Sequence, residues 1–93
     1  MKDVKKVMCF CVCGIGTSLM MEMAVKDALK NLGREDIEVE HSTVDDIYEG
    51  AADLFICGES LVERAQSCGP TIGLINMASV EEAQEKIGEF LNS

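Results

Sequence analysis

The stretch that decides the fold is VMCFCVCGIGTSLM, which covers residues 7–20. Its apolar half predicts a buried strand that ends at Cys11, and a glycine-containing loop then leads into a helix that Thr17 or Ser18 can cap. A helix start leaves backbone N–H groups unpaired and carries a partial positive charge, so such a loop can hold a tetrahedral oxyanion. The same field lowers the pKa of a thiol and favours the thiolate. We therefore expect a phosphate-handling cysteine at position 11.

The composition is that of one small domain, and we expect a single domain over residues 1–93. The hydrophobic share of 47% is ample for one modest core. Seventeen acidic residues against eight basic ones give a net charge of −9. That charge opposes binding to nucleic acid and to anionic lipid, so we expect no nucleic-acid partner.

The five cysteines are not arranged as in a secreted disulfide scaffold, and the sequence shows no signal peptide. The apolar run at residues 4–12 is too short to span a bilayer. We expect a cytoplasmic protein with reduced thiols and no direct insertion into the membrane.

Strand patterns alternate with helix patterns four times along the chain. The predicted strands are residues 4–10, 37–41, 52–57 and 71–75. The predicted helical segments are a long helix that stops at Gly33, one turn at residues 44–48, a short helix at 60–66, and a last helix that begins with a capping box at 79–82. A turn is expected at residues 68–70.

This alternation predicts an α/β fold, a single three-layer domain with a four-stranded parallel sheet in the order 2-1-3-4 and helices on both faces. Ligands of such sheets bind beyond the carboxyl ends of the strands, where the strand order reverses. The first strand is predicted to be central, so Cys11 should lie at that point.

The long helix is expected to be amphipathic. Its apolar residues at helical spacing are Met21, Val25, Ala28, Leu29 and Leu32. The polar face should carry Glu22, Lys26, Asp27 and Lys30.

The loop after Cys11 suits a phosphoryl group in two ways. Gly14 and Gly16 let the backbone turn its N–H groups inward, and Thr17 and Ser18 add hydroxyl donors. A cysteine thiolate is both a good nucleophile and a good leaving group, so it can accept a phosphoryl group and pass it on.

Other interpretations of the cysteines are simpler. Cys9 and Cys57 lie within apolar strands and are expected to be buried and inert, while Cys68 is expected to be a turn residue. Cys13 lies inside the loop, and its role stays open. A Cys11–Cys13 disulfide is awkward in so short a loop.

Metal binding and phosphatase chemistry fit the loop less well. Zinc and iron–sulfur sites usually use paired Cys-x-x-Cys elements, which this chain lacks, so we expect neither a metal nor a cofactor. Cysteine phosphatases use Cys-x5-Arg, in which the Arg clamps the phosphate, but the matching position here is Thr17. A phosphatase-like hydrolase and a redox or regulatory module remain the alternative hypotheses.

Three polar residues lie near the predicted ends of strands. His41, the lone histidine, is expected to be a surface residue. Glu59 is expected to cap the short helix at 60–66, because a carboxylate facing the Cys11 loop would repel phosphate. Asn76 could line the same rim.

Residues 11–20, CVCGIGTSLM, resemble the phosphorylation loop of enzyme IIB components of the bacterial sugar phosphotransferase system, of the lactose, galactitol and ascorbate types. That loop has Cys-x-x-Gly-x-x-Thr/Ser-Ser before a Met-containing helix. Chain length and strand–helix alternation are similar over nearly the whole sequence. Residues 73–77, GLINM, followed by ASVEEA, look most like the ascorbate branch.

The resemblance implies a phosphotransferase. A phosphohistidine of a IIA partner would give its phosphoryl group to Cys11, and the phosphocysteine would pass it to a sugar held by the membrane-embedded IIC permease. IIC would also recruit the protein to the inner face of the membrane. The resemblance implies a phosphate-holding loop made of Val12, Cys13, Gly14, Ile15, Gly16, Thr17 and Ser18. Relatives often have Gly or Ser where this chain has Val12 and Cys13.

Overall fold

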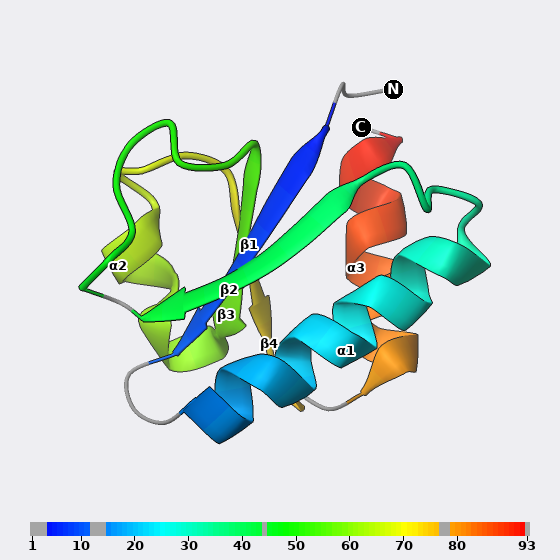
Figure 1. Ribbon diagram of the computed structural model, residues 1–93, viewed down its shortest axis with the longest axis horizontal. Coiled ribbons are helices and arrows are strands. Elements are labelled where there is room, and N and C mark those ends of the chain that lie inside the picture. The colour runs from blue at the N-terminus through cyan, green and yellow to red at the C-terminus, as the bar shows by residue number, and fades with distance from the viewer. Residues whose placement is uncertain (1–3, 12–14, 44, 77–78, 93) are drawn as a thin grey trace.

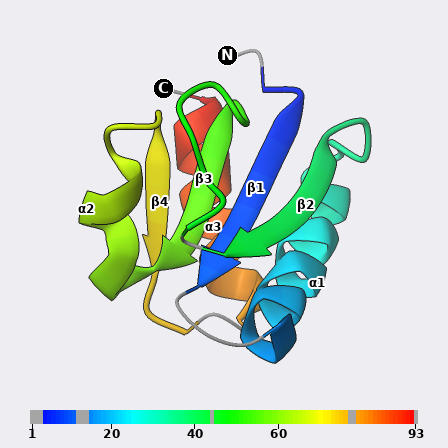
Figure 2. The same ribbon diagram turned by 60° about the vertical axis from the view of Figure 1, so that its left-hand side comes forward.

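The computed structural model describes residues 4–11, 15–43, 45–76 and 79–92. Its four strands are β1 (Lys6–Cys11), β2 (Glu38–Thr43), β3 (Leu54–Gly58) and β4 (Thr71–Leu74). All neighbouring strands are parallel, and the order across the sheet is β2-β1-β3-β4 (Figure 2). The predicted parallel sheet and its strand order are therefore confirmed.

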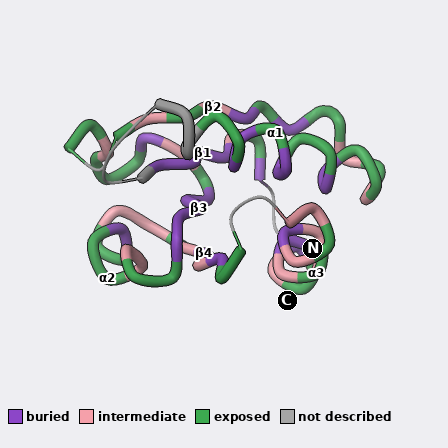
Figure 3. Tube along the Cα trace, turned by 90° about the horizontal axis from the view of Figure 1, so that it is seen from below, coloured by how far each residue is buried: buried purple, intermediate pink, exposed green. Residues whose placement is uncertain are grey.

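Helices cover both faces of this sheet, as expected for a parallel sheet (Figure 3). The long helix α1 (Ile15–Asn31) and the last helix α3 (Val80–Leu91) pack against each other on one face. The short helices η1 (Glu59–Leu61) and α2 (Val62–Ala65) lie on the other face, against β3 and β4. The predicted three layers are confirmed.

The two central strands divide the core in two, because successive side chains of a strand point to opposite faces. One set faces α1 and α3 and includes Val7, Cys9, Leu54 and Ile56. The alternate set packs with the α2 side and includes Met8, Phe10, Phe55 and Cys57. Every residue of β3 is buried. A strand buried on both faces explains why its sequence is a continuous apolar run.

The apolar stripe of α1 is confirmed for four residues, Met21, Val25, Ala28 and Leu29, which are buried. Leu32 follows the helix and is partly buried against the same core. The helix ends at Asn31, and Gly33 adopts a φ of +76°, a left-handed conformation that suits the glycine expected to stop it. The placement of Glu22 on the exposed polar face is wrong, because this carboxylate is buried between α1 and β2.

Two local predictions differ from the structure. The helical turn expected at residues 44–48 is wrong for 45–48, which form a turn and an irregular segment, and Val44 lies outside the described residues. The long helix begins at Ile15, so Thr17 and Ser18 belong to its first turn and do not cap it. A helix capped by Thr17 would begin at residue 18, so the observed start at Ile15 is three residues earlier. None of the described helices is long and apolar enough to cross a membrane.

Phe55 is the residue whose loss should cost the fold most on the α2 side of the sheet. Its ring is fully buried and meets the ring of Phe10 edge to face, with centroids 6.5 Å apart. We expect Phe55→Ala to lower the free energy of unfolding by about 3–5 kcal/mol, because the cavity adds to the lost transfer energy. Urea denaturation followed by circular dichroism measures this loss.

Tyr48→Ala is the control, since the Tyr48 side chain is 65% exposed and should change stability by less than about 0.5 kcal/mol. Equal effects of the two substitutions would contradict the placement of Phe55 in the core.

Candidate functional site

The strand order reverses next to β1, and the carboxyl edge of the sheet at this point is the candidate site. From β1 the chain goes to β2 on one side, and from β2 it crosses over to β3 on the other side of β1. A crevice at such a switch point is the usual ligand site of an open parallel sheet. Cys11 is the last residue of β1 and pairs with Thr43, the last residue of β2. The backbone of Cys11 therefore ends a central strand at the switch point.

The predicted phosphate loop is only partly described. Val12, Cys13 and Gly14 lie outside the described residues, as do the side chains of Cys11, Ile15, Gly16, Thr17 and Ser18. The fold does bring the end of β1 and the start of α1 together within these few residues (Figure 1). The cup of amides around Cys11 stays a prediction, on a backbone that has the required strand-to-helix setting.

The start of α1 supplies a favourable field for an anion. The helix has 17 residues and its first turn carries no acidic side chain. A helix of this length has a partial positive charge at its amino end, where the first N–H groups lack acceptors within the helix. A carboxylate in the first turn would neutralise that charge. Its absence leaves the field available to a ligand at the end of β1.

Glu59 lies after the neighbouring strand β3 and is exposed. It is the first residue of η1, while the N-cap position belongs to Gly58, which offers no side-chain hydrogen bond. The prediction that Glu59 caps the short helix is therefore wrong. Its carboxylate lies in the first turn instead, where a negative charge still suits the helix dipole.

Glu82 fixes the turn that follows β4 at the same edge. Its two carboxylate oxygens accept hydrogen bonds from the backbone N–H groups of Ile75 at 2.7 Å and Asn76 at 2.8 Å. These bonds hold the pKa of Glu82 down at about 2, with a smaller contribution from Lys86 at 2.9 Å. The Ser79 hydroxyl accepts from the Glu82 N–H at 3.2 Å, so half of the predicted capping box is confirmed.

The other half of that box is replaced. A reciprocal bond from Glu82 would return to the backbone of Ser79, but the carboxylate reaches further back to residues 75 and 76. The sequence did not predict this contact. The capping-box pattern of Ser79 and Glu82 placed the Glu82 carboxylate at the helix start, but not on the amides of residues 75 and 76. Two consecutive amides that hold an anion form the same kind of concavity that binds phosphate in other proteins.

A side-chain contact between Glu22 and His41 ties α1 to the edge strand β2. Nδ1 of His41 lies 2.9 Å from Oε1 of Glu22, and Nζ of Lys26 lies 3.5 Å from Oε2 of the same carboxylate. The Glu22 side chain is only 11% exposed, whereas His41 is 39% exposed. His41 is thus at the surface as predicted, but it has a partner that the sequence did not reveal. The contact fixes the second turn of α1 against the sheet, close to the end of β1.

The described cysteines behave as the sequence predicts. Cys9 and Cys57 are fully buried. Burial raises the pKa of the Cys9 thiol strongly and that of Cys57 to about 11, so both stay protonated and unreactive near neutral pH. Cys68 is half-buried in the turn before β4. The two fully buried thiols, Cys9 and Cys57, are therefore not available as nucleophiles in the folded protein.

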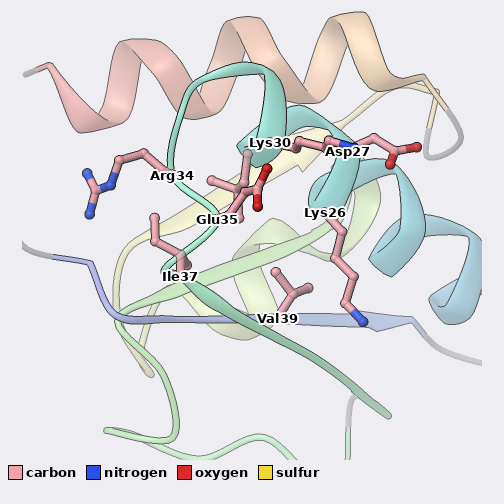
Figure 4. A pocket seen from close by; sticks show the side chains of 8 residues that line it. Lys26, Asp27, Lys30, Arg34, Glu35, Ile37 and Val39 are labelled. Atoms are coloured by element: carbon pink, nitrogen blue, oxygen red, sulfur yellow. The ribbon is translucent and has the colours of Figure 1, made fainter.

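A surface depression of about 260 Å³ lies away from this edge (Figure 4). Its walls come from the second half of α1, the loop after it and the start of β2: Lys26, Asp27, Leu29, Lys30, Arg34, Glu35, Ile37 and Val39. Cations and carboxylates alternate around it, and Arg34 is already paired with Asp36 at 3.2 Å. The residues that line this depression do not form a recognisable catalytic site.

The comparisons with known proteins agree with this geometry. A family model described as "PTS system, Lactose/Cellobiose specific IIB subunit" matches residues 6–89. This chain belongs to that family. The expected resemblance to enzyme IIB components is thereby confirmed, and the chain is a phosphoryl-carrier subunit of a sugar phosphotransferase system.

A solved relative of this IIB chain has the same fold. It is the lactose-specific IIB component domain of the phosphoenolpyruvate:carbohydrate phosphotransferase system from Streptococcus pneumoniae, with a TM-score of 0.59 and 19% sequence identity. The match covers 94% of this chain and 97% of that chain. No curated protein matches the sequence. The matching family model is of the lactose/cellobiose type, so the suggested kinship with the ascorbate branch stays a prediction.

The bond between Glu82 and the turn at residues 75 and 76 should be visible in the pH dependence of stability. Because the pKa of Glu82 falls from its ordinary 4.5 to about 2 on folding, its contribution is complete above pH 4.5 and is lost as the pH falls towards 2. We expect Glu82→Gln to lower the free energy of unfolding at pH 7 by about 1 kcal/mol, because the hydrogen-bonded carboxylate lies close to solvent and its charge is partly screened. The deficit should shrink between pH 4.5 and pH 2.

Urea denaturation at a series of pH values measures the deficit. Glu81→Gln is the matched control. Glu81 is exposed in the same first turn of α3, and its substitution removes the same charge. A deficit of Glu82→Gln that stays constant down to pH 2 would show that the carboxylate charge is not what holds the turn.

Proposed function

We propose that this IIB subunit carries a phosphoryl group on Cys11, which it accepts from a phosphohistidine of a IIA protein and passes to a sugar bound by a membrane-embedded IIC permease. The observation that carries the proposal is the setting of Cys11: the last residue of a central parallel strand, at the switch point, just before the start of a long helix. IIB domains generally work with IIA and IIC components.

The transfer consists of two in-line displacements at phosphorus. In the first, Sγ of the Cys11 thiolate attacks the phosphoryl group, an S–P bond forms, the P–N bond breaks, and the histidine of IIA takes up a proton as it leaves. In the second, a sugar hydroxyl attacks the same phosphorus. An O–P bond forms, the S–P bond breaks, the thiolate is restored, and the hydroxyl proton passes to a base or to solvent on the IIC side.

The chain's own contribution is positioning and charge. The first turn of α1 lacks acidic residues, so the helix dipole acts on the phosphoryl oxygens without a competing carboxylate. Backbone N–H groups of residues 12–18 are proposed to hold these oxygens, with the hydroxyls of Thr17 and Ser18 as further donors. The part-buried contact between Glu22 and His41 holds α1 against the sheet.

The loop sequence also suits a carrier better than a hydrolase. Residues 11–18 contain no Arg and no obvious general acid, so attack by water on the phosphocysteine should be slow. A slow reaction with water lets the phosphoryl group last until the next partner arrives. We further propose that IIC recruits the subunit to the cytoplasmic face of the membrane and that selection of the sugar takes place mainly within IIC.

The identity of the nucleophile can be tested with radiolabelled phospho-IIA. We expect the wild-type subunit to take up label and Cys11→Ser to lose uptake by on the order of 10³-fold or more, because the covalent nucleophile is gone. Peptide mapping of the labelled protein identifies the modified residue. Cys13→Ser is the matched control, since it removes a thiol from the same loop and should keep the label.

Label that persists in Cys11→Ser and disappears in Cys13→Ser would move the nucleophile to Cys13. Circular dichroism of both variants excludes unfolding as the cause. Rapid turnover of an aryl phosphate that depends on Cys11 would instead favour a hydrolase.

The reactivity of the thiols towards iodoacetamide provides a second test. A thiolate stabilised at the start of α1 should be alkylated at Cys11 well below the ordinary thiol pKa of about 8.5. Cys9 and Cys57 are internal controls, because burial raises their pKa values and they should react only after unfolding. Mass spectrometry after alkylation at a series of pH values gives the profile of each cysteine. A Cys11 profile like that of a free thiol in solution would contradict the proposed field.

A further inference from the structure

Most of the contacts that hold α1 on the sheet are apolar. The buried side of the helix consists of Met21, Val25, Ala28 and Leu29, which pack in the same core cluster as residues of the strands. The hydrophobic effect depends on the area removed from water and has no direction, so it specifies the exact position of a helix only weakly. Directional contacts are therefore the ones that can fix α1 at one place along the sheet.

Two side-chain hydrogen bonds join the described side chains of α1, those of residues 19–31, to other elements. At the far end of the helix, Nδ2 of Asn31 donates to Oε1 of Gln84 on α3 at 3.1 Å, in an exposed position. In the second turn, Nδ1 of His41 on β2 lies 2.9 Å from Oε1 of Glu22. An ionised carboxylate can only accept, so Nδ1 carries the proton in this contact. Of the two bonds, this one ties the helix to the sheet.

The Glu22–His41 contact lies close to the candidate site along both elements. His41 comes two residues before Thr43, which is paired with Cys11 in the strand register. At about 3.3 Å per residue, His41 is roughly 7 Å from the end of β2. Glu22 comes seven residues after the helix start at Ile15, which is roughly 10 Å along the helix axis. The contact therefore joins the two elements near the segment that leads from β1 to α1.

The carboxylate of Glu22 also lies near β1, and the helix runs alongside β2 (Figure 2). Cys9 of β1 is the register partner of His41 and belongs to the core cluster on the α1 side. Burial is the main cause that raises the pKa of the Cys9 thiol, and the charge of Glu22 raises it further. One side chain of α1 thus meets both strands beside the switch point.

A short connection separates β1 from α1. Residues 12–14 lie between Cys11, the last residue of the strand, and Ile15, the first residue of the helix. A slide of the helix by one residue is about 1.5 Å, and each residue of a connection spans at most about 3.6 Å. Three residues can absorb little of such a slide. The place of the helix start relative to Cys11 therefore depends on where α1 sits on the sheet.

Stability alone does not account for a polar contact at this place. The Glu22 side chain is only 11% exposed, and an apolar pair of similar volume is often as stable as a buried polar pair or more stable. Lys26, at 3.5 Å, offsets part of the charge, but it belongs to the same helix and does not join it to the sheet. The bond to His41 adds direction, because a hydrogen bond forms only within a narrow range of distance and angle.

Resting on the proposed function, we propose that Glu22 and His41 are positioning residues for phosphoryl transfer. Their hydrogen bond sets the place of the start of α1 relative to Cys11, and with it the aim of the helix dipole and of the backbone N–H groups at the phosphoryl oxygens. Both residues act through the helix and not by contact with phosphorus. Placement matters for an in-line displacement, since an error of about 1 Å can lower the rate on the order of 10²-fold.

The test replaces the polar pair by an apolar pair, which separates positioning from stability. Glu22→Met/His41→Leu removes the hydrogen bond and keeps a similar volume, so the free energy of unfolding should stay the same or rise. The rate of label transfer from saturating phospho-IIA should fall about 10- to 100-fold, while the donor concentration that gives half the maximal rate stays within about twofold. A stable variant that transfers label at the wild-type rate would overturn the proposal.

Single substitutions show which interaction matters. His41→Ala should lower the transfer rate as the apolar pair does, and His41→Asn should restore most of it, because the Asn amide places a donor where Nδ1 lies in histidine. Lys26→Ala is the matched control, since it removes a cation from the same carboxylate and leaves the bond to β2. Asn31→Ala removes the bond at the far end of the same helix. Both controls should stay within about twofold of the wild-type rate.

Two results of this series would contradict the positioning role. A loss in Lys26→Ala as large as that in His41→Ala would show that the charge of Glu22 has to be offset and that the tie to β2 is not what matters. A transfer rate of His41→Asn as low as that of His41→Ala would show that the hydrogen bond is not what the histidine supplies. Circular dichroism confirms that each variant is folded.

Alkylation by iodoacetamide reports on the helix start without IIA. In Glu22→Met/His41→Leu, the rate at Cys11 at pH 7 should fall about two- to fivefold, because the field of the helix start is no longer aimed at the thiol. Cys57 is the internal control, since it is fully buried in the core cluster on the other side of the sheet. It should stay unreactive in every folded variant.

This measurement keeps the positioning role separate from the phosphocysteine proposal. If the label proves to lie on Cys13, a lowered alkylation rate at Cys11 in the apolar pair variant still supports the positioning role. If wild-type protein carries the label on Cys11, and the variant keeps both its alkylation profile and its transfer rate, the positioning role is overturned and the carrier function stands.

Discussion

Burial of β1 and β3 on both faces is the constraint on which the rest of the structure depends. Each strand has apolar residues on both sides, so helices must cover the sheet twice. Parallel strands must be joined by crossover connections, which here include the covering helices. In this chain the crossovers place β2 and β3 on opposite sides of β1. The switch point at the carboxyl edge follows from this crossing, and Cys11 ends the first strand there. Packing thus determines where the chemistry can take place.

Charge at that edge is controlled by hydrogen bonds as much as by composition. A chain of net charge −9 should repel a phosphoryl group, yet two of its carboxylates on the elements around the edge are engaged. Glu82 is bound by the amides of Ile75 and Asn76, and Glu22 by His41 and Lys26. Each carboxylate then stabilises a turn or a helix position, and its charge is partly offset. The first turn of α1 has no acidic residue, so no carboxylate there opposes the positive end of the helix dipole.

The parts of this molecule that could be predicted from its sequence are those with a local periodic signal. Apolar runs predicted the four strands, and their alternation with helices predicted a parallel sheet covered on both faces. The contact between Glu22 and His41 was missed because 19 residues separate them and their approach depends on the packing of α1 on β2. The start of α1 was placed too late because Thr17 and Ser18 are favourable N-cap residues and were taken as the start of the helix. Segment 45–48 lacks the helix that its composition suggested, because nothing in the pattern distinguishes one helical turn from other turns.

A carrier that passes a group between two proteins must bind each of them weakly and expose its nucleophile to both in turn. This chain is small and acidic, and its proposed nucleophile, Cys11, is the last residue of a central strand at the carboxyl edge of the sheet. Small interfaces with charged rims form quickly because electrostatic attraction speeds association. They also dissociate quickly, because they bury little apolar area. In the proposed relay, donor and acceptor must both reach Cys11 at the same edge of the sheet, so the donor has to leave before the acceptor can approach.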